Sequence, residues 1–532
     1  MKKKQFIKLP INYSESVNKS AELVRLLGKA KIDNKSLSEF LTIDGINYWE
    51  LFSPKLSIHH VNNILGSDKL YSQSLAQYLI RKLKIIRLAL SHWKNYFYFI
   101  LNKNKETRNL KNVKKNSIMF LAFSKYLYRD ALMPITINTL LKNKNKVLIS
   151  EFNNQGLNHS ESLLFINPWT IWDKQSKLKY ANLKNILKRL KTEFNKSNFL
   201  ETSIPSELKD KNIYFSYMFD DLFDLYFPHI LFQIITAQKI LKKYPPSIII
   251  SPDVSDPRTR IYSMLCHSLK IPSIELQSGL YGNEAVEWQF LTSDYVLPWG
   301  ETTKNYMIDH GVHKDKIIVS GSPRHDFKYK LTKADIQKKR KEFEIPANKS
   351  IFLLASTFND KHHSNYANPD ILDSMKESIY KSTMESPNIV LIVKPHPFEN
   401  PESTKKIIKE VPNKIIYADR KCDIRELIHI SDTFLSFGST TTIDAIIANK
   451  FVICPIFPGW VFSSLIKDLA HYQPDNHEDM INIFNSFNGE FSKKNQYLTN
   501  SSIKKSLKRL IYKYDNLSTK RVSKIILKKI HN

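Results

Sequence analysis

Short apolar runs recur along most of the chain from residue 117 onward, and this feature constrains the fold more than any other. Between residues 117 and 277 the runs are SIMFLAFS, KVLIS, PSIIIS and IPSIELQ, separated by stretches long enough for helices. Parallel strands that are buried on both faces read as continuous apolar runs. A strand, a helix and a second strand at this spacing form a βαβ unit. The pattern predicts an α/β, doubly wound domain over residues 113–290.

A second series of apolar runs begins at DYVLPWG, residues 294–300. It continues with KIIVSG, IFLLAST, VLIVKPHP, KIIYAD, TFLSFGS and FVICPI, which end at residue 456. This series predicts a second Rossmann-like domain over residues 291–500, and the basic stretch 501–532 predicts one or two helices after it. A chain of 532 residues is too long for one core and long enough for two such domains.

The first 112 residues do not show this alternation, and we expect a mostly helical N-terminal extension. Residues 78–103 place apolar and aromatic residues at helical spacing, with Arg and Lys between them. Such a segment can be a packed amphipathic helix or can lie on a membrane interface. No run reaches the roughly 18 to 20 apolar residues that a spanning helix needs, and no secretory signal opens the chain.

The net charge of +29 requires an explanation. Phosphorylated substrates and an anionic membrane surface would both be attracted to it, and an AT-rich genome would by itself enrich lysine. No nucleic-acid-binding motif accompanies the charge, so we expect no nucleic-acid partner. The three cysteines are scattered and form no disulfide framework, which favours the reducing cytoplasm.

Polar side chains gather where the predicted strands of the second domain end. Ligands of open parallel sheets bind beyond the carboxyl ends of the strands. Hydroxyl residues 439–442 also precede a helix expected near Ile443, and a helix N-terminus favours phosphate. One hydroxyl would suffice for an N-cap. The candidate phosphate ligands are Arg324, Ser356, Lys394, His396, Ser439, Thr440 and Thr441.

The first domain supplies the candidate acids and bases of the same cleft. Asp253 and Asp256 follow the run PSIIIS, and Glu284 lies in the segment 275–289. Each of these three carboxylates is a candidate general base toward an acceptor hydroxyl. An alternative for Asp253 and Asp256 is that one of them caps the helix that Pro257 begins. Gln277 and Gly279 are expected to line the acceptor side of the cleft.

The order of these motifs resembles a known group of proteins. LQSGLYGN, DYVLPWG, VSGSPRHD, VKPHP and GSTTTIDAIIANK follow one another over residues 245–460. This order is similar to that of GT-B glycosyltransferases of bacterial surface and capsule polysaccharide assembly. The resemblance includes the HP-motif sialyl- and Kdo-transferases and the CDP-glycerol glycerophosphotransferases.

The resemblance implies two Rossmann-like domains facing a cleft, a nucleotide-activated donor held mainly by the C-terminal domain, and no metal or other cofactor. His396, Ser439 and Thr440 match residues that contact the donor phosphate in the group. Arg324 matches the arginine of its GxPR-type segment. This chain has Ser278-Gly279 where many members have His-Gly, so no catalytic histidine is expected there.

We therefore expect a cytoplasmic glycosyltransferase, peripheral at the inner face of the membrane. It would move a sugar from a nucleotide-sugar donor to a surface glycan or a lipid-linked acceptor. The HP motif favours a cytidine nucleotide. Three alternatives stay open: a glycerophosphotransferase that uses CDP-glycerol, a nucleotide-sugar 2-epimerase, and an inactive GT-B scaffold subunit.

Overall fold

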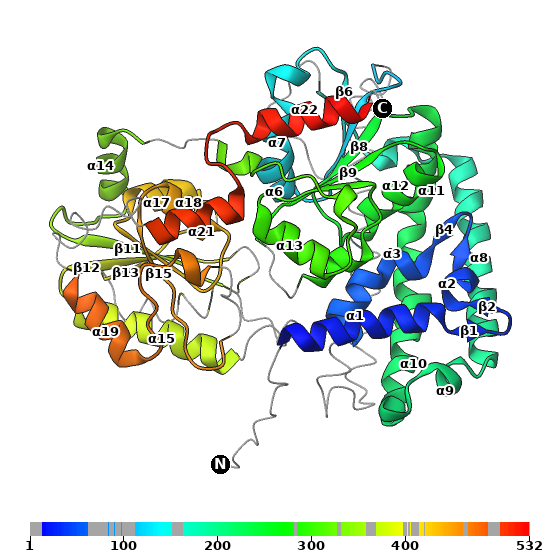
Figure 1. Cartoon of the computed structure of the whole chain (residues 1–532), viewed down its shortest axis with the longest axis horizontal. Coiled ribbons are helices and arrows are strands. Elements are labelled where there is room, and N and C mark those ends of the chain that lie inside the picture. The colour runs from blue at the N-terminus through cyan, green and yellow to red at the C-terminus, as the bar shows by residue number, and fades with distance from the viewer. Residues whose placement is uncertain are drawn as a thin grey trace.

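The chain folds into two α/β halves that lie side by side, with the N-terminal extension packed against the first half (Figure 1). The computed structural model describes residues 13–61, 83, 90, 97, 112–151, 163–280, 285–326, 331–357, 369–396, 399, 402, 405, 414–419, 421–460, 466–487 and 501–530. Within these residues no helix is long and apolar enough to cross a bilayer.

The first half is built on a six-stranded sheet with the strand order β10-β9-β8-β5-β6-β7, and every pairing in it is parallel. Its central strands are fully buried, as their apolar sequences require. The strands are β5 (Ile118–Leu121), β6 (Lys146–Ile149), β7 (Leu163–Ile166), β8 (Ile248–Ser251), β9 (Ser273–Leu276) and β10 (Tyr295–Leu297).

Helices and short turns surround this sheet. They are α6 (Lys125–Leu127), η2 (Tyr128–Leu132), α7 (Met133–Thr136), η3 (Thr139–Leu141), η4 (Pro168–Ile171), α8 (Lys174–Lys196), α9 (Phe199–Ser203), η5 (Ser206–Lys211), α10 (Asn212–Asp221), η6 (Leu222–Tyr226), α11 (Phe227–Lys243), α12 (Pro257–Ser268), η7 (Val286–Phe290), α13 (Glu301–Asp309), η8 (Lys314–Lys316) and η9 (Pro323–Asp326).

The second half is built on a five-stranded parallel sheet with the order β13-β12-β11-β14-β15. Its strands are β11 (Ser350–Ala355), β12 (Ile389–Lys394), β13 (Ile415–Tyr417), β14 (Thr433–Ser436) and β15 (Phe451–Ile453). Its helical elements are α14 (Lys333–Glu342), α15 (Pro369–Glu385), α17 (Ile424–Ile430), α18 (Thr441–Ile447), η10 (Lys467–Leu469), α19 (His477–Ser486) and α21 (Ser501–Ile511).

Alternate residues of the central strands enter two different cores. Ile351 and Leu353 of β11 pack with α17, α18 and α21, whereas Phe352 and Leu354 pack with α15 and α19. Successive side chains of a strand point to opposite faces of the sheet. This confirms the predicted fold class, which is two doubly wound α/β units with helices on both faces.

The segment 294–300 belongs to the first sheet, because β10 pairs with β9. Residues 316–321, predicted as a strand of the second domain, form only one bridge and run beside β10, where Ile318 N donates to Val296 O at 3.0 Å. This corrects the sequence-based boundary between residues 290 and 291. An apolar run shows that a strand is buried, but strand pairing decides which sheet it joins.

The N-terminal extension combines short helices with two small hairpins. It contains α1 (Tyr13–Lys29), α2 (Leu37–Phe40), α3 (Tyr48–Lys55), η1 (Leu56–Val61) and the strands β1 (Lys31–Ile32), β2 (Lys35–Ser36), β3 (Thr42–Ile43) and β4 (Ile46–Asn47). It shares one hydrophobic core with the first half, and Arg260 Nη2 donates to Glu50 O at 2.7 Å. The predicted amphipathic segment 78–103 lies outside the described residues except at positions 83, 90 and 97.

The basic C-terminal segment forms two helices that pack on different halves. Helix α21 packs in the core of the second half and contacts α13, where the backbone of Gly300 approaches it so closely that a Cβ would lie 2.2 Å from Arg509 O. Helix α22 (Ser518–Ile530) returns to the first half, where Val522 and Ile526 pack in the core beneath α7 and η3. Figure 1 shows both helices in red.

Candidate functional site

The carboxyl ends of β11, β12 and β14 lie side by side at one edge of the second sheet. Ala355 pairs with Lys394 on one side and with Ser436 on the other, and Ser356 N donates to Lys394 O at 3.0 Å. The structure therefore brings Ser356, Lys394, His396 and the loop that contains Ser439 to one edge. We call this edge the second rim.

A buried carboxylate, Glu399, organises the second rim. Its Oε1 accepts hydrogen bonds from Ser356 Oγ at 2.9 Å and from Lys376 Nζ at 2.7 Å, and its Oε2 accepts from the backbone N of His396 at 3.1 Å. The residue is 4% exposed. Lys376 offsets the charge of the Glu399 carboxylate. Through its hydrogen bonds, Glu399 connects α15, the end of β11 and the turn after β12.

Sequence reasoning missed Glu399. The only signal was an acidic residue three positions after His396, and one Glu in a turn is not a pattern.

The imidazole of His396 is neutral at physiological pH. Burial lowers its pKa below the ordinary value, and the Glu399 carboxylate opposes that shift only in part. Next to it, Lys394 Nζ donates to Asp419 O at 2.9 Å. At the second rim the ammonium of Lys394 therefore supplies positive charge, and the ring of His396 supplies a hydrogen-bonding group without a net charge.

The hydroxyl run 439–442 divides into three environments. Ser439 Oγ and Thr441 Oγ1 lie 2.8 Å apart, Thr442 is fully buried, and Thr440 Oγ1 accepts a hydrogen bond from Leu280 N of the first half at 3.2 Å. Helix α18 begins at Thr441 rather than near Ile443, and Thr440 makes no capping bond with its side chain. Because α18 has only seven residues, the hydroxyl groups support an anion-binding site more strongly than the helix dipole does.

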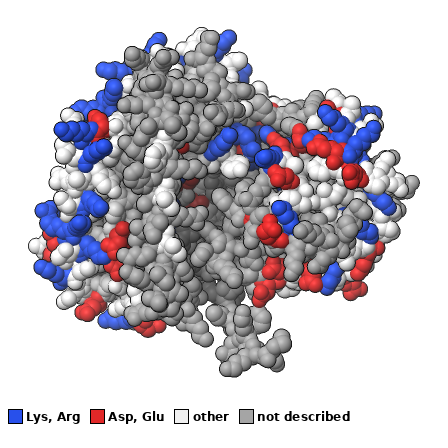
Figure 2. All heavy atoms as spheres, turned by 180° about the vertical axis from the view of Figure 1, so that it is seen from behind, with Lys and Arg blue, Asp and Glu red and all other residues white. Residues whose placement is uncertain are grey.

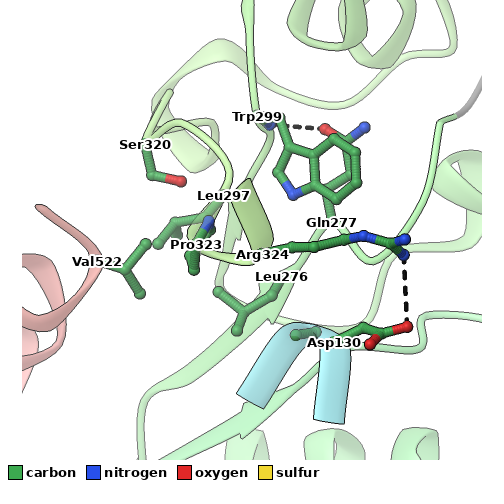
Figure 3. A pocket seen from close by; sticks show the side chains of 10 residues that line it. Asp130, Leu276, Gln277, Leu297, Trp299, Ser320, Pro323, Arg324 and Val522 are labelled. Atoms are coloured by element: carbon green, nitrogen blue, oxygen red, sulfur yellow. Dashed lines mark hydrogen bonds and ion pairs between the residues drawn. The ribbon is translucent and has the colours of Figure 1, made fainter. Parts of the chain in front are cut away.

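The carboxyl edge of the first sheet meets the second rim through the loop after β9. Gln277 stabilises this loop, because its Oε1 accepts from Trp299 N at 2.6 Å (Figure 3) and its Nε2 donates to Gly279 O at 2.7 Å. A Cβ on Gly279 would lie 3.6 Å from Thr440 Oγ1. The predicted cleft residues Gln277 and Gly279 thus lie where the two edges meet, with Gln277 acting as a loop brace.

Arg324 joins the two halves through an ion-pair network. Its Nη2 lies 2.8 Å from Asp444 Oδ2 of α18, and its Nη1 lies 3.4 Å from Asp130 Oδ2 of η2. Figure 3 shows the contact with Asp130 beside a small pocket that Trp299, Gln277 and Val522 also line. Burial lowers the pKa of Arg324, but the two carboxylates outweigh it and raise the pKa, so the guanidinium stays charged.

Arg324, predicted as a phosphate ligand, does not follow a strand of the second sheet, although its guanidinium contacts Asp444 of α18, the helix that begins at Thr441 of the second rim. It follows the segment 316–321, which runs beside the first sheet, and two carboxylates already occupy its guanidinium.

The edge of the first sheet is acidic, and its two predicted aspartates differ in environment. Asp256 caps α12 by accepting from Arg258 N at 2.8 Å and forms an ion pair with Arg258 at 2.6 Å. Burial raises the pKa of Asp256, but the adjacent Arg258 outweighs it and leaves the pKa below the ordinary value. The capping alternative therefore describes Asp256.

Asp253 lies on the same edge and has a raised pKa. Its Oδ1 accepts from Ser255 N and Asp256 N, both at 3.1 Å. Burial, together with the charge of Asp256, raises the pKa of Asp253 to about 6. Of the three predicted bases, Asp253 has the environment typical of a proton acceptor. Glu284 lies outside the described residues.

No group of three or more His, Cys, Asp or Glu side chains within the described ranges is arranged to hold a metal ion. That the protein needs no metal or cofactor stays a prediction, as do the chemical roles of the site residues.

The fold and the meeting of the two edges define the class of protein. Two parallel sheets with helices on both faces contact each other through residues 277–280 and 440, and the face seen in Figure 2 is hollowed between the halves. This is the GT-B, glycosyltransferase-like architecture that the sequence predicts.

A family-model match makes the relationship more specific. Residues 282–458 match the model described as CDP-Glycerol:Poly(glycerophosphate) glycerophosphotransferase. The matched segment contains the whole second rim and supports the resemblance predicted from the motif order. No curated protein matches the chain in sequence.

Several solved structures resemble the chain at low identity. A glycosyltransferase from Rickettsia africae has a TM-score of 0.47 and 16% identity, over 79% of this chain and 99% of that one. The UDP-GlcNAc 2-epimerase of Neisseria meningitidis has a TM-score of 0.44 and 14% identity, over 78% and 100%. Anabaena HepE in complex with UDP-glucose has a TM-score of 0.47 and 11% identity, over 77% and 99%. These likenesses are too distant to bear on function.

Proposed function

We propose that this protein is a glycosyltransferase that moves a sugar from a nucleotide-activated donor to a surface glycan or a lipid-linked acceptor. One observation carries the proposal. Three neighbouring strand ends deliver Ser356, Lys394, His396 and the Ser439–Thr441 hydroxyl pair to one edge, inside the segment that matches the family model. Hydroxyls, an ammonium and a neutral imidazole are groups that bind a phosphate.

The second rim would act on the leaving group. In the transfer, the acceptor oxygen bonds to the anomeric carbon while the bond from that carbon to the nucleotide phosphate breaks. The phosphate leaves with the electron pair, and negative charge develops on its oxygens. Preorganised donors such as Lys394 and the rim hydroxyls stabilise that charge.

Asp253 would accept the proton of the acceptor hydroxyl. With a pKa of about 6, its carboxyl group is mostly ionised at neutral pH. It is also basic enough to take a proton as the oxygen attacks. Asp253 follows β8, and Gln277 follows β9, the neighbouring strand that leads to the contact with the second half.

A second candidate function is glycerophosphotransfer, because the matched family model carries that description. Here the acceptor oxygen would attack the glycerol-linked phosphorus of CDP-glycerol, and CMP would leave. The same rim and the same base would serve. The cytidine nucleotide that the HP motif favours would suit this donor as well as a CMP-sugar.

The first experiment is a thermal-shift titration of the purified chain with CMP, CDP, UDP and GDP. A ligand that binds the folded state raises the melting temperature with its occupancy. We expect one nucleotide to stabilise the wild type and to lose this effect in His396→Ala. A matched control is His313→Ala, because His313 is exposed and lies outside the rim. No shift with any nucleotide would contradict the proposal.

The second experiment separates the enzymatic alternatives once the nucleobase is known. CDP-glycerol and nucleotide sugars of that base are incubated with and without a lipid-linked acceptor. Nucleotide release that depends on the acceptor supports a transferase, and the donor that is consumed identifies which one. Isomerisation of the sugar without an acceptor would identify an epimerase, and binding without turnover an inactive scaffold.

The proposed acceptor also gives the proposed location. A lipid-linked acceptor would be met at the inner face of the cytoplasmic membrane, and the basic surfaces of the chain suit an anionic bilayer. A peripheral protein of the cytoplasm is therefore part of the proposal.

A further inference from the structure

Helix α22 and the segment 137–144 form one continuous surface of the first half. On its inner side, Val522 and Ile526 of α22 share a core with Ile135 of α7 and Leu141 of η3. The helix contacts both α7 and η3, and Figure 1 shows α22 and α7 together at one end of the half. We call the outward side chains of α22 and of residues 137–144 the α22 surface.

The α22 surface is basic and contains no acidic residue. Residues 131–150 and 516–532 include no Asp or Glu. The side chains of Lys520, Lys524 and Lys528 on α22 are exposed, as is that of Lys142 beside η3. Two apolar side chains of the adjoining segment are also exposed, Ile137 at 44% and Leu140 at 38%.

Other lysine-rich parts of the chain differ in this respect. Helix α21 is also basic, and it contacts α13 and η10, which carry the exposed acids Glu301, Asp309 and Asp468. At α22 the neighbouring acids Asp326 and Asp515 lie at the N-terminal end, where they bond Ser518 N and Arg521. On the face seen in Figure 2, acidic and basic side chains are interspersed over both halves. The α22 surface therefore combines charge of one sign with exposed apolar groups, which a composition rich in lysine does not by itself produce.

We propose that the α22 surface docks onto an anionic lipid bilayer. Lysines near such a surface are attracted to its phosphate headgroups, and Ile137 and Leu140 would enter the boundary between headgroups and acyl chains. Charge complementarity favours a bilayer as the partner, because its headgroups would bind the lysines and its acyl chains would contact the two apolar residues.

The inner side of helix α22 reaches the contact between the two halves. Val522 lines the small pocket beside Gln277 and Arg324 (Figure 3). At the start of the helix, the backbone N of Ser518 donates to Asp326 of η9 at 3.1 Å. Docking would therefore hold the region between the halves close to the bilayer. That this serves a lipid-linked acceptor rests on the proposed function, whereas the docking itself does not.

Vesicle flotation tests the inference with the full chain. Wild type is compared on phosphatidylcholine vesicles and on vesicles that also contain phosphatidylglycerol. The test variant is K520Q/K524Q/K528Q, and the matched control is K504Q/K505Q/K508Q on α21, which removes the same charge. We expect the α22 variant to lose binding to anionic vesicles by on the order of a hundredfold, while the α21 control changes far less.

Two further measurements separate the apolar and ionic parts. I137S/L140S is expected to weaken binding to anionic vesicles severalfold, and salt of about 1 M, where the Debye length is about 3 Å, should weaken it further. The nucleotide-induced thermal shift is measured on every variant, because it reports the proposed function independently. Vesicle binding without any nucleotide shift would leave the docking surface intact and remove the proposed function.

Several outcomes would overturn the inference. Failure of the wild type to float with either kind of vesicle would do so. Equal loss of binding in the α21 and α22 variants would show that net charge and not this surface is responsible. Displacement from vesicles by duplex DNA, with no effect of I137S/L140S, would show a general polyanion site instead.

Discussion

The two facing edges of this molecule carry opposite chemistry. At the edge of the first sheet, Asp256 and Glu151 pair with the guanidinium of Arg258, and Asp253 lies beside Asp256. The second rim carries the ammonium of Lys394, the imidazole of His396 and several hydroxyls, and its buried carboxylate Glu399 bonds Ser356, Lys376 and the backbone N of His396. An acidic edge suits proton acceptance and a hydroxyl-rich, basic edge suits a leaving phosphate, so the comparison assigns different steps of one transfer to the two sheets.

The comparison fails most clearly if Asp253 is not the base. Asp253→Asn is expected to lower kcat/KM by roughly 100- to 10,000-fold, the usual contribution of general base catalysis. In wild type, kcat/KM should fall as the pH drops below about 6, because the raised pKa of Asp253 lets it gain a proton there. A pH-rate profile with no acidic limb near pH 6 would exclude this role.

The neighbouring aspartate provides the control. The charge of Asp256 helps to raise the pKa of Asp253, so Asp256→Asn should move the acidic limb to lower pH instead of abolishing activity. Asp256→Asn should also lower stability, because it removes the ion pair with Arg258.

Asp253→Asn is expected to stabilise the fold at neutral pH. A folded-state pKa raised from 3.8 to about 6 means that ionising Asp253 destabilises the native state, by up to about 3 kcal/mol for two pKa units. The free energy of unfolding of the wild type therefore falls as the pH rises from about 4 to 6, and it stays lower above pH 6. The variant's advantage should therefore be largest above pH 6 and absent near pH 4 in urea denaturation.

Arg324 tests whether the halves are joined by ion pairs or by a shared ligand. Arg324→Met removes the charged partner of Asp444, while Asp130 keeps its ion pair with Arg129 at 2.6 Å. Breaking a buried pair in this way costs about 3–5 kcal/mol. We expect a large loss of unfolding free energy with nucleotide affinity unchanged in whatever fraction stays folded. If instead affinity falls while stability holds, Arg324 is the phosphate ligand that the sequence indicated.

The sequence predicts the second rim better than it predicts Arg324, and the reason is geometric. Carboxyl ends of parallel strands share an edge, so Lys394 and Ser439 could be brought together from strand positions alone. Residues 316–321 are as apolar as a strand of either sheet, and only tertiary pairing places them beside β10. The boundary at 290 and the position of Arg324 both depended on that pairing.

The sequence also does not show which polar side chains already have all their hydrogen-bond partners within the protein. The amide of Gln277 is occupied on both sides by the backbone of its own half, and Glu399 is occupied by three donors from different elements. Neither pattern has a sequence period. A polar residue near a strand end could therefore be predicted as near the site, but not as a ligand or as a brace.

Glu399 is predicted to act on the second rim through His396. In Glu399→Gln one of the two side-chain positions becomes an NH2 group facing a donor, either Lys376 Nζ or His396 N. Losing a hydrogen bond to a charged group costs about 1.5–3 kcal/mol, so stability and nucleotide affinity should both fall. In a double-mutant cycle with His396→Ala, the affinity loss should be less than additive. Full additivity would show that Glu399 has only a structural role.

The smallest predicted effect concerns the hydrogen bond between Leu280 and Thr440, which joins the two edges. Thr440→Val keeps the shape of the side chain but removes the acceptor of Leu280 N, which is worth about 1 kcal/mol. The amide of Leu280 should then exchange with deuterium roughly fivefold faster, as this free energy implies. Ser439→Ala is the control, because its hydroxyl bonds Thr441 within the second half. Slow exchange at Leu280 in both variants would mean that the edges are held together elsewhere. The acidic and basic edges would then differ in composition without being joined by this hydrogen bond.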